Sequence, residues 1–174
     1  MSATAKPRDA VALLKQDHDE VKAMFKQYEE LGDRAFASKQ KLAEKICLEL
    51  TKHAIAEEEI FYPAVRADVD DADDLVDEAT VEHASAKDLI AQIHAMDPHD
   101  DLYDAKVKVL GEYIEHHVKE EEEEMFPAAK EAAKGSKLDL VALGEQIQAR
   151  KDEIDEIPPM PVPGKVVYSN QPSA

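Results

Sequence analysis

Residues 53–64 read HAIAEEEIFYPA, and residues 117–128 read HVKEEEEEMFPA. The two segments are near copies, because each has a histidine, a glutamate four residues later, and an aromatic residue followed by proline near its end. In each copy another histidine, directly preceded by an acid, lies upstream of the first histidine of the segment, by 35 residues in one copy and 34 in the other. One unit therefore occurs twice, and it repeats metal-ligand residue types rather than apolar residues alone. The four histidines are His18, His53, His83 and His117.

Apolar residues around these histidines recur at intervals of three and four, which is the pattern of one face of an amphipathic helix. No run of β-branched residues alternates as in a strand. Asp9 is expected to cap the first helix, and Pro63 and Pro127 are expected to end the second and fourth, because proline lacks a backbone donor. The sequence thus predicts an all-α fold, an antiparallel up-down four-helix bundle. Its helices are expected at about 9–32, 37–62, 73–96 and 100–126.

The chain is expected to divide into three parts. The bundle occupies residues 1–130, an accessory C-terminal helix residues 131–156, and an extended proline-rich tail residues 157–174. Apolar residues at 140, 147 and 154 indicate the accessory helix. The tail has prolines at 158, 159, 161 and 163, which favour an extended chain.

The charge of the chain restricts its partners. The formal net charge is −18, from 21 Lys and Arg against 39 Asp and Glu. A polyanion repels nucleic acid and anionic membrane surfaces, so neither is an expected partner. No apolar stretch approaches the roughly 20 residues that span a bilayer, and residues 1–6 lack the apolar core of a signal peptide. A single cysteine, Cys47, fits a reducing compartment, and a cytoplasmic location is expected.

The four histidines and two glutamates fall on the apolar faces of the expected helices. Residues four apart share a helical face, so each His-x-x-x-Glu pair points into the bundle. A carboxylate without a partner there is costly, and metal cations remove that cost. Four imidazoles and two carboxylates suit two divalent ions, each with two histidines and both glutamates bridging. Such nitrogen and oxygen donors favour iron or manganese and permit zinc. The predicted ligands are His18, His53, Glu57, His83, His117 and Glu121.

One alternative shifts the second motif by a residue, to His116 with Glu120. His117 is preferred, because it and His53 each precede a proline by ten residues. The run from 120 to 124 is expected to be a solvated face with one ligand in it. His94 returns to the face of His83 but lies about 16 Å along the helix, too far to share a metal.

Other nearby residues receive simpler interpretations. Glu58 and Glu122, which follow the predicted bridging glutamates, are expected in solvent. Lys87 is expected to extend to the surface. Tyr62 is interpreted as a core or boundary residue, although a tyrosine near a metal pair is able to ligate or to be oxidised.

The order His, His-x-x-x-Glu, His, His-x-x-x-Glu, with Glu-Glu and an aromatic-Pro pair closing each half, resembles the hemerythrin-like (HHE cation-binding) domain over roughly residues 9–130. The resemblance implies a non-haem di-iron centre held by the six predicted ligands. Two positions differ from the oxygen-carrying hemerythrins: Lys87 stands where those have a fifth histidine, and Glu121 where they have aspartate. The four-His, two-Glu set is similar to that of the di-iron proteins of iron–sulfur-cluster repair, whose cysteine-bearing N-terminal segment has no counterpart before His18.

These observations predict a non-haem di-iron protein that binds O2, NO or peroxide and is redox-active in oxidative or nitrosative stress, with an unknown electron donor. The alternative is iron or oxygen storage, or sensing, by binding without turnover. A third class is a metal-free helical bundle that serves as an interaction module.

Overall fold

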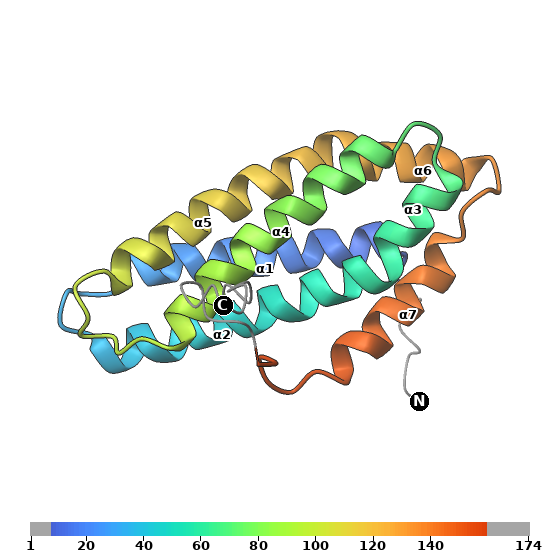
Figure 1. Ribbon diagram of the computed structural model, residues 1–174. Coiled ribbons are helices and arrows are strands. Elements are labelled where there is room, and N and C mark those ends of the chain that lie inside the picture. Colours follow the sequence, from blue (N-terminus) through green and yellow to red (C-terminus); the bar gives the residue numbers. More distant parts are fainter. Residues whose placement is uncertain (1–7, 160–174) are drawn as a thin grey trace, which may run out of the picture.

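The computed structural model describes residues 8–159, and every regular element in this range is a helix, which confirms the predicted all-α class. Four long helices run side by side (Figure 1), with α1 against α2 and α4 against α5. None of the helices in the described range combines the length and apolar character needed to cross a bilayer. The long helices are α1 (Ala10–Glu29), α2 (Phe36–Ala56), α4 (Asp73–His94) and α5 (Tyr103–Glu120).

The start of α1 follows the expected capping pattern. The Asp9 side chain accepts a hydrogen bond of 2.8 Å from the backbone N–H of Ala12, which otherwise has no partner in the first turn. The helix ends at Glu29, a few residues before Gly32. The apolar residues of its inner face are buried, as the spacing predicts.

The prediction that Pro63 and Pro127 end their helices is wrong. The chain stays helical through both, because each follows a wider π-helical turn, η1 (Glu57–Phe61) or η2 (Glu121–Met125). The prolines then lie in the first turn of a further helix, α3 (Tyr62–Asp68) or α6 (Phe126–Lys134). A missing N–H costs little at that position. Both π-helical turns begin at a predicted bridging glutamate, and such turns are frequent at functional sites.

Two apolar clusters form the core. One lies toward the N-terminal end of α1 and includes Leu14, Phe61 and Phe126. The other includes Val21 and Leu110. His18 falls between Leu14 and Val21 on α1, so the predicted metal ligands lie where the two clusters meet. Apolar packing on both sides therefore encloses a polar centre.

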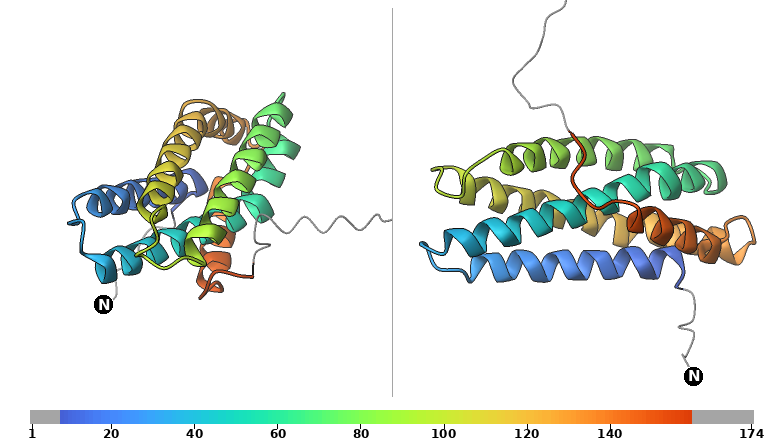
Figure 2. Two further views of the ribbon diagram at one scale, coloured as in Figure 1. Left: turned by 60° about the vertical axis from the view of Figure 1, so that its left-hand side comes forward. Right: turned by 90° about the horizontal axis from the view of Figure 1, so that it is seen from below.

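The last described helix, α7 (Leu140–Asp152), packs against α1, α2 and η1. Figures 1 and 2 show it crossing the outside of α1 and α2. Its residue Ile147 is fully buried in the first apolar cluster, and Ile154 just beyond it is also buried. The expected tail from residue 157 lies almost entirely outside the described residues.

Gly144 allows α7 to approach the start of α1. A Cβ atom there would press into the carbonyl oxygen of Arg8 and lie 3.0 Å from the backbone nitrogen of Ala10. Backbone atoms cannot swing aside as a side chain does, so Gly144→Ala is expected to lower the free energy of unfolding by about 1–3 kcal/mol. Urea unfolding followed by circular dichroism measures this. Gly32→Ala, where nothing lies within 4 Å, is the control and should change stability far less.

Candidate metal centre

All six predicted ligands come together inside the molecule. They are contributed by α1, α2, α4, α5 and the two π-helical turns, and none is more than 6% exposed. Neighbouring His116 points outward, so the structure places His117 rather than His116 in this cluster. His94 is exposed and lies outside this cluster, whereas the sequence had placed it on the same helical face as the buried His83. The six residues are His18, His53, Glu57, His83, His117 and Glu121.

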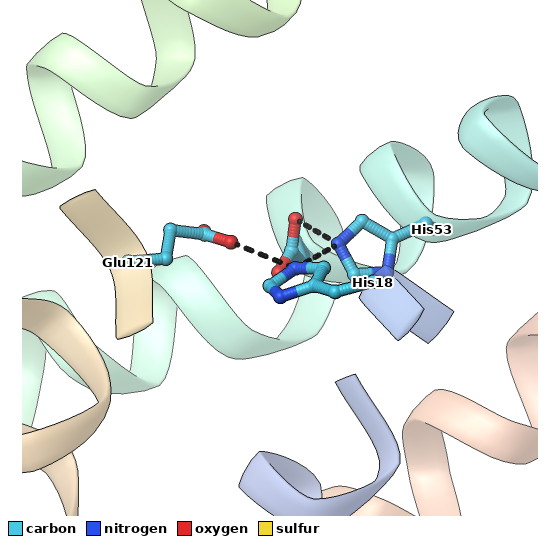
Figure 3. Close-up of side chains that lie close together, drawn as sticks. His18, His53 and Glu121 are labelled. Carbon is cyan, nitrogen blue, oxygen red and sulfur yellow. Dashed lines mark hydrogen bonds and ion pairs between the residues drawn. The ribbon is translucent and has the colours of Figure 1, made fainter. Parts of the chain in front are cut away.

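The first half of the cluster pairs His18 with His53. Their Nε2 atoms lie 3.2 Å apart, and Figure 3 shows both rings and Glu121 directed toward one another. Glu121 Oε2 lies 3.3 Å from His18 Nε2, and Glu57 Oε2 lies 3.1 Å from His53 Nε2. Two imidazoles and two carboxylates therefore face one point.

The second half pairs His83 with His117 in the same way. Their Nε2 atoms lie 3.1 Å apart. Glu57 Oε2 is also 3.3 Å from His83 Nε2, and Glu121 Oε2 is 3.4 Å from His117 Nε2. Each glutamate thus contacts one histidine of each pair, which is the arrangement that bridging ligands require.

The outward nitrogen of every histidine contacts a carboxylate. Donation of the Nδ1 proton to that carboxylate fixes the ring and leaves the Nε2 lone pair facing the centre. The expectation that Glu58 and Glu122 lie in solvent is therefore wrong. The sequence contained a signal for these contacts. In both copies an acid directly precedes the first histidine, and a second glutamate directly follows the predicted bridging glutamate. The contacts are His18–Glu122 at 2.9 Å, His53–Asp17 at 3.0 Å, His83–Glu58 at 3.0 Å and His117–Glu82 at 2.7 Å.

Two of these outer carboxylates accept short hydrogen bonds from lysines, and Lys15 Nζ lies 3.8 Å from an oxygen of a third, Glu122. Lys87 Nζ donates to both oxygens of Glu58, at 2.6 and 2.7 Å, so it does not simply extend to the surface as expected. Lys151, which is only 8% exposed, donates to Asp17 over 2.5 Å. It comes from α7, and its role was not predicted because no local pattern links it to a helix 134 residues away.

Tyr62 is a further polar group in the centre. Its hydroxyl donates to Glu121 Oε1 over 2.7 Å and lies 3.2 Å from His83 Nε2. Burial, with the charges of Glu57 and Glu121, holds the pKa of Tyr62 well above its usual range, so the hydroxyl keeps its proton. The second copy has Phe126 in the equivalent place, and this difference was the available indication that Tyr62 has a polar role.

Burial and the neighbouring charges act in opposite directions on the pKa values of the groups in the centre. Burial lowers the pKa of His53, but the charge of Glu57 and the hydrogen bond with Asp17 outweigh it and raise this pKa to about 10. Burial opposes ionisation of Glu121, yet the histidines around it hold its pKa well below the usual range. At a separation near 3 Å, the two Nε2 atoms of a pair have room for only one proton between them. Protons alone therefore neutralise this donor set poorly.

Two buried oxygens support the same conclusion. Glu57 Oε1 and Glu121 Oε2 accept no hydrogen bond from any group in residues 8–159. A buried carboxylate oxygen without a donor costs free energy, and a cation removes that cost. Nitrogen and oxygen donors in this ratio suit divalent first-row transition metals. The residues present therefore fit a pair of metal cations.

The outer carboxylates are expected to tune metal affinity. Asp17→Asn keeps the shape of the side chain but removes the charge that orients His53 and pairs with Lys151, so affinity should fall about 10–100-fold. Competition with a coloured chelator measures this change. Asp19→Asn makes the same charge change at an exposed site on the same helix and should leave affinity near that of the wild type.

The fold and centre define a class of helical proteins in which a buried set of histidines and glutamates forms a potential cation site. Residues 9–129 match the hemerythrin HHE cation binding domain, and the chain belongs to this family. A structure of an HHE cation binding domain-containing protein from Mycobacterium kansasii has the same fold, with 24% sequence identity and a TM-score of 0.69. The likeness covers 84% of this chain and 87% of that one.

A protein from Nostoc sp. named DNA nickase is 32% identical over 119 residues. The match covers 67% of this chain but 32% of the Nostoc protein, so it spans about a third of that relative's length.

Proposed function

We propose that the chain holds two non-haem iron ions and uses them to bind O2, NO or peroxide in oxidative or nitrosative stress. His18 and His53 would hold one ion, and His83 and His117 the other. Glu57 and Glu121 would bridge the two. The observation that supports this most directly is the convergence of four Nε2 atoms on two buried glutamates, each of which contacts both histidine pairs.

The donor set favours iron or manganese and also permits zinc. Iron is proposed because, when bound, it supplies the electron exchange that reactions of O2, NO and peroxide need. The centre belongs to residues 1–130, which we take as the antiparallel four-helix bundle, with the accessory helix at 131–156 packed on it. A cytoplasmic location fits reduced iron, and the electron donor is not identified.

A small cavity beside the histidines suits a diatomic ligand. Its volume is about 20 Å³, against the roughly 10–15 Å³ that admits one water molecule. The rings of all four histidines line it, together with apolar side chains such as Leu50, Ile90 and Val118. These apolar walls exclude bulk water, and they favour a small, weakly polar molecule over a larger substrate.

The protein groups around the proposed centre have distinct roles. The Tyr62 hydroxyl retains its proton and donates it in a hydrogen bond to Glu121, one of the proposed bridging groups. Asp17 and Glu58 keep the rings of His53 and His83 in fixed orientations. Nicking of DNA is not part of this proposal, because the net charge of −18 repels phosphates.

Anaerobic titration of the purified protein with Fe²⁺ tests the proposal. Two ions per chain are expected, with a sharp endpoint. Peroxide is then added to the reduced protein: continued loss of peroxide supports turnover, whereas a stable adduct supports the alternative role in storage or sensing. Failure to retain any metal after iron-replete expression and anaerobic titration would refute both roles.

A further inference from the structure

A second group of metal-ligand side chains lies on the surface next to the proposed centre. His116 Nε2 is 3.4 Å from Glu82 Oε1 and 3.2 Å from Glu120 Oε1. Ligand atoms of these three residues all lie within 4.8 Å of one another. The His116 side chain is 64% exposed, so its ring is accessible to ions in solution. One imidazole with two carboxylates is a donor set that suits divalent transition metals.

Glu82 connects this outer group to the interior. While Oε1 faces His116, Oε2 lies 2.7 Å from Nδ1 of His117, whose other nitrogen faces the proposed centre. The outer group and the inner centre therefore share a contact through one carboxylate and one imidazole. None of the other three outer carboxylates contacts a second histidine within residues 8–159.

A narrow cavity borders both the outer group and the proposed centre. It has a volume of about 10 Å³ and lies between α4, α5 and η2. Glu82 and Glu120 of the outer group border it, and so do two proposed ligands of the centre, His117 and Glu121. Glu121 is 2% exposed and has an oxygen, Oε2, that accepts no hydrogen bond in the described part of the chain. The lining includes Glu78, Glu82, Glu120, His117, Glu121 and Met125.

The duplicated sequence supplies an internal comparison. In the first copy, the places of His116 and Glu120 are taken by Lys52 and Ala56, and that of Glu78 by Leu13. The counterpart of Glu82 there is Asp17, which Lys151 already neutralises. One side of the centre is thus closed by a cation from α7. The other carries a negative, histidine-bearing surface, although both sides descend from the same repeated unit.

We propose that His116, Glu82 and Glu120 form an outer site that captures a divalent transition-metal ion and passes it along the cavity to the inner centre. The proposal rests on the metal-binding role proposed above. Carboxylates at the mouth raise the local concentration of cations, and clefts of one charge increase association rates about 10- to 1000-fold. The outer site has only three ligands and binds the ion weakly. It therefore releases the ion to the inner centre, which has more ligands.

Co²⁺ is a suitable probe, because its visible absorption reports entry into nitrogen and oxygen sites. In stopped-flow mixing at limiting Co²⁺, the double variant H116Q/E120Q is expected to fill the centre about tenfold more slowly than the wild type, with the same final occupancy. Equilibrium dialysis of fully loaded wild type should reveal a third, weakly held ion per chain, and this ion should be lost in the variant.

The control variant H99Q/E115Q removes one exposed imidazole and one exposed carboxylate that are not members of the outer group. It should load at the wild-type rate and keep the third ion. An unchanged loading rate in H116Q/E120Q, or retention of the third ion, overturns the outer site. A chain that never fills its inner centre would refute the proposed function instead, and dialysis would still show whether His116 binds Co²⁺.

Discussion

His53→Ala and His117→Ala are each expected to lose most of the bound metal. Each substitution removes one of the four proposed imidazole ligands and leaves an outer carboxylate, Asp17 or Glu82, without its buried histidine partner. Loss of an outer partner alone weakens metal binding about 10–100-fold, so loss of a ligand should exceed about 100-fold. Metal content after dialysis, measured by atomic emission, gives the result directly.

The control for this experiment is His94→Ala. His94 is exposed at the end of α4, the helix that also carries His83, so its removal takes away an imidazole without affecting the centre. Far-ultraviolet circular dichroism should show that all three variants remain helical. Equal metal content in the three proteins would refute the ligand assignment.

The sequence was most informative where the repeat fixed both residue type and spacing. A histidine and a glutamate four residues apart on an apolar helical face must share that face, so the convergence of His53 with Glu57 follows from helix geometry. The same argument places His117 with Glu121. Helix positions were also predictable, because apolar periodicity directly reflects which face is buried.

The helix ends and the outer contacts were harder to predict. Proline was expected to stop a helix, but a π-helical turn just before Pro63 moves it into the first turn of a new helix, where its missing donor matters little. Such a turn has no reliable sequence pattern. The carboxylate partners of the histidines depend on how neighbouring helices are rotated, so Glu58 and Glu122 resembled ordinary surface acids.

Contacts from distant elements were not predictable at all. Lys151 lies on α7, beyond the part of the chain that matches the family, and only the packing of α7 across α1 brings it to Asp17. Tyr62 is an intermediate case, since the sequence placed it beside the metal motif, and only its replacement by Phe126 in the second copy indicated a polar role. The repeated unit therefore determines the proposed ligands, whereas tertiary packing determines what surrounds them.

Removal of the metal is expected to make stability strongly dependent on pH. In the metal-free chain the pKa of His53 is about 10, above its ordinary value of 6.5. Its stabilising contribution is therefore complete below about 6.5 and is lost as the pH rises through about 10. The pKa of Glu121 is lowered, so its contribution is present above its ordinary value and is lost only in acid. The metal-free protein should consequently become less stable from pH 7 to 10.

The metal-loaded protein should behave in the opposite way over the same range. A metal binds imidazole only without its Nε2 proton, so bound ions keep the centre neutralised at high pH, and protons displace them at low pH. With free metal at 100 times Kd, each ion adds about 2.7 kcal/mol, and two add about 5 kcal/mol. For a chain of this length that corresponds to a rise in Tm of roughly 10–20 °C. Thermal unfolding at pH 6, 7.5 and 9, with and without Fe²⁺ under anaerobic conditions, should show a difference in Tm that grows with pH. A difference that shrinks with pH, or an equal Tm in both forms at pH 9, would mean that the buried imidazoles and carboxylates balance each other without a metal.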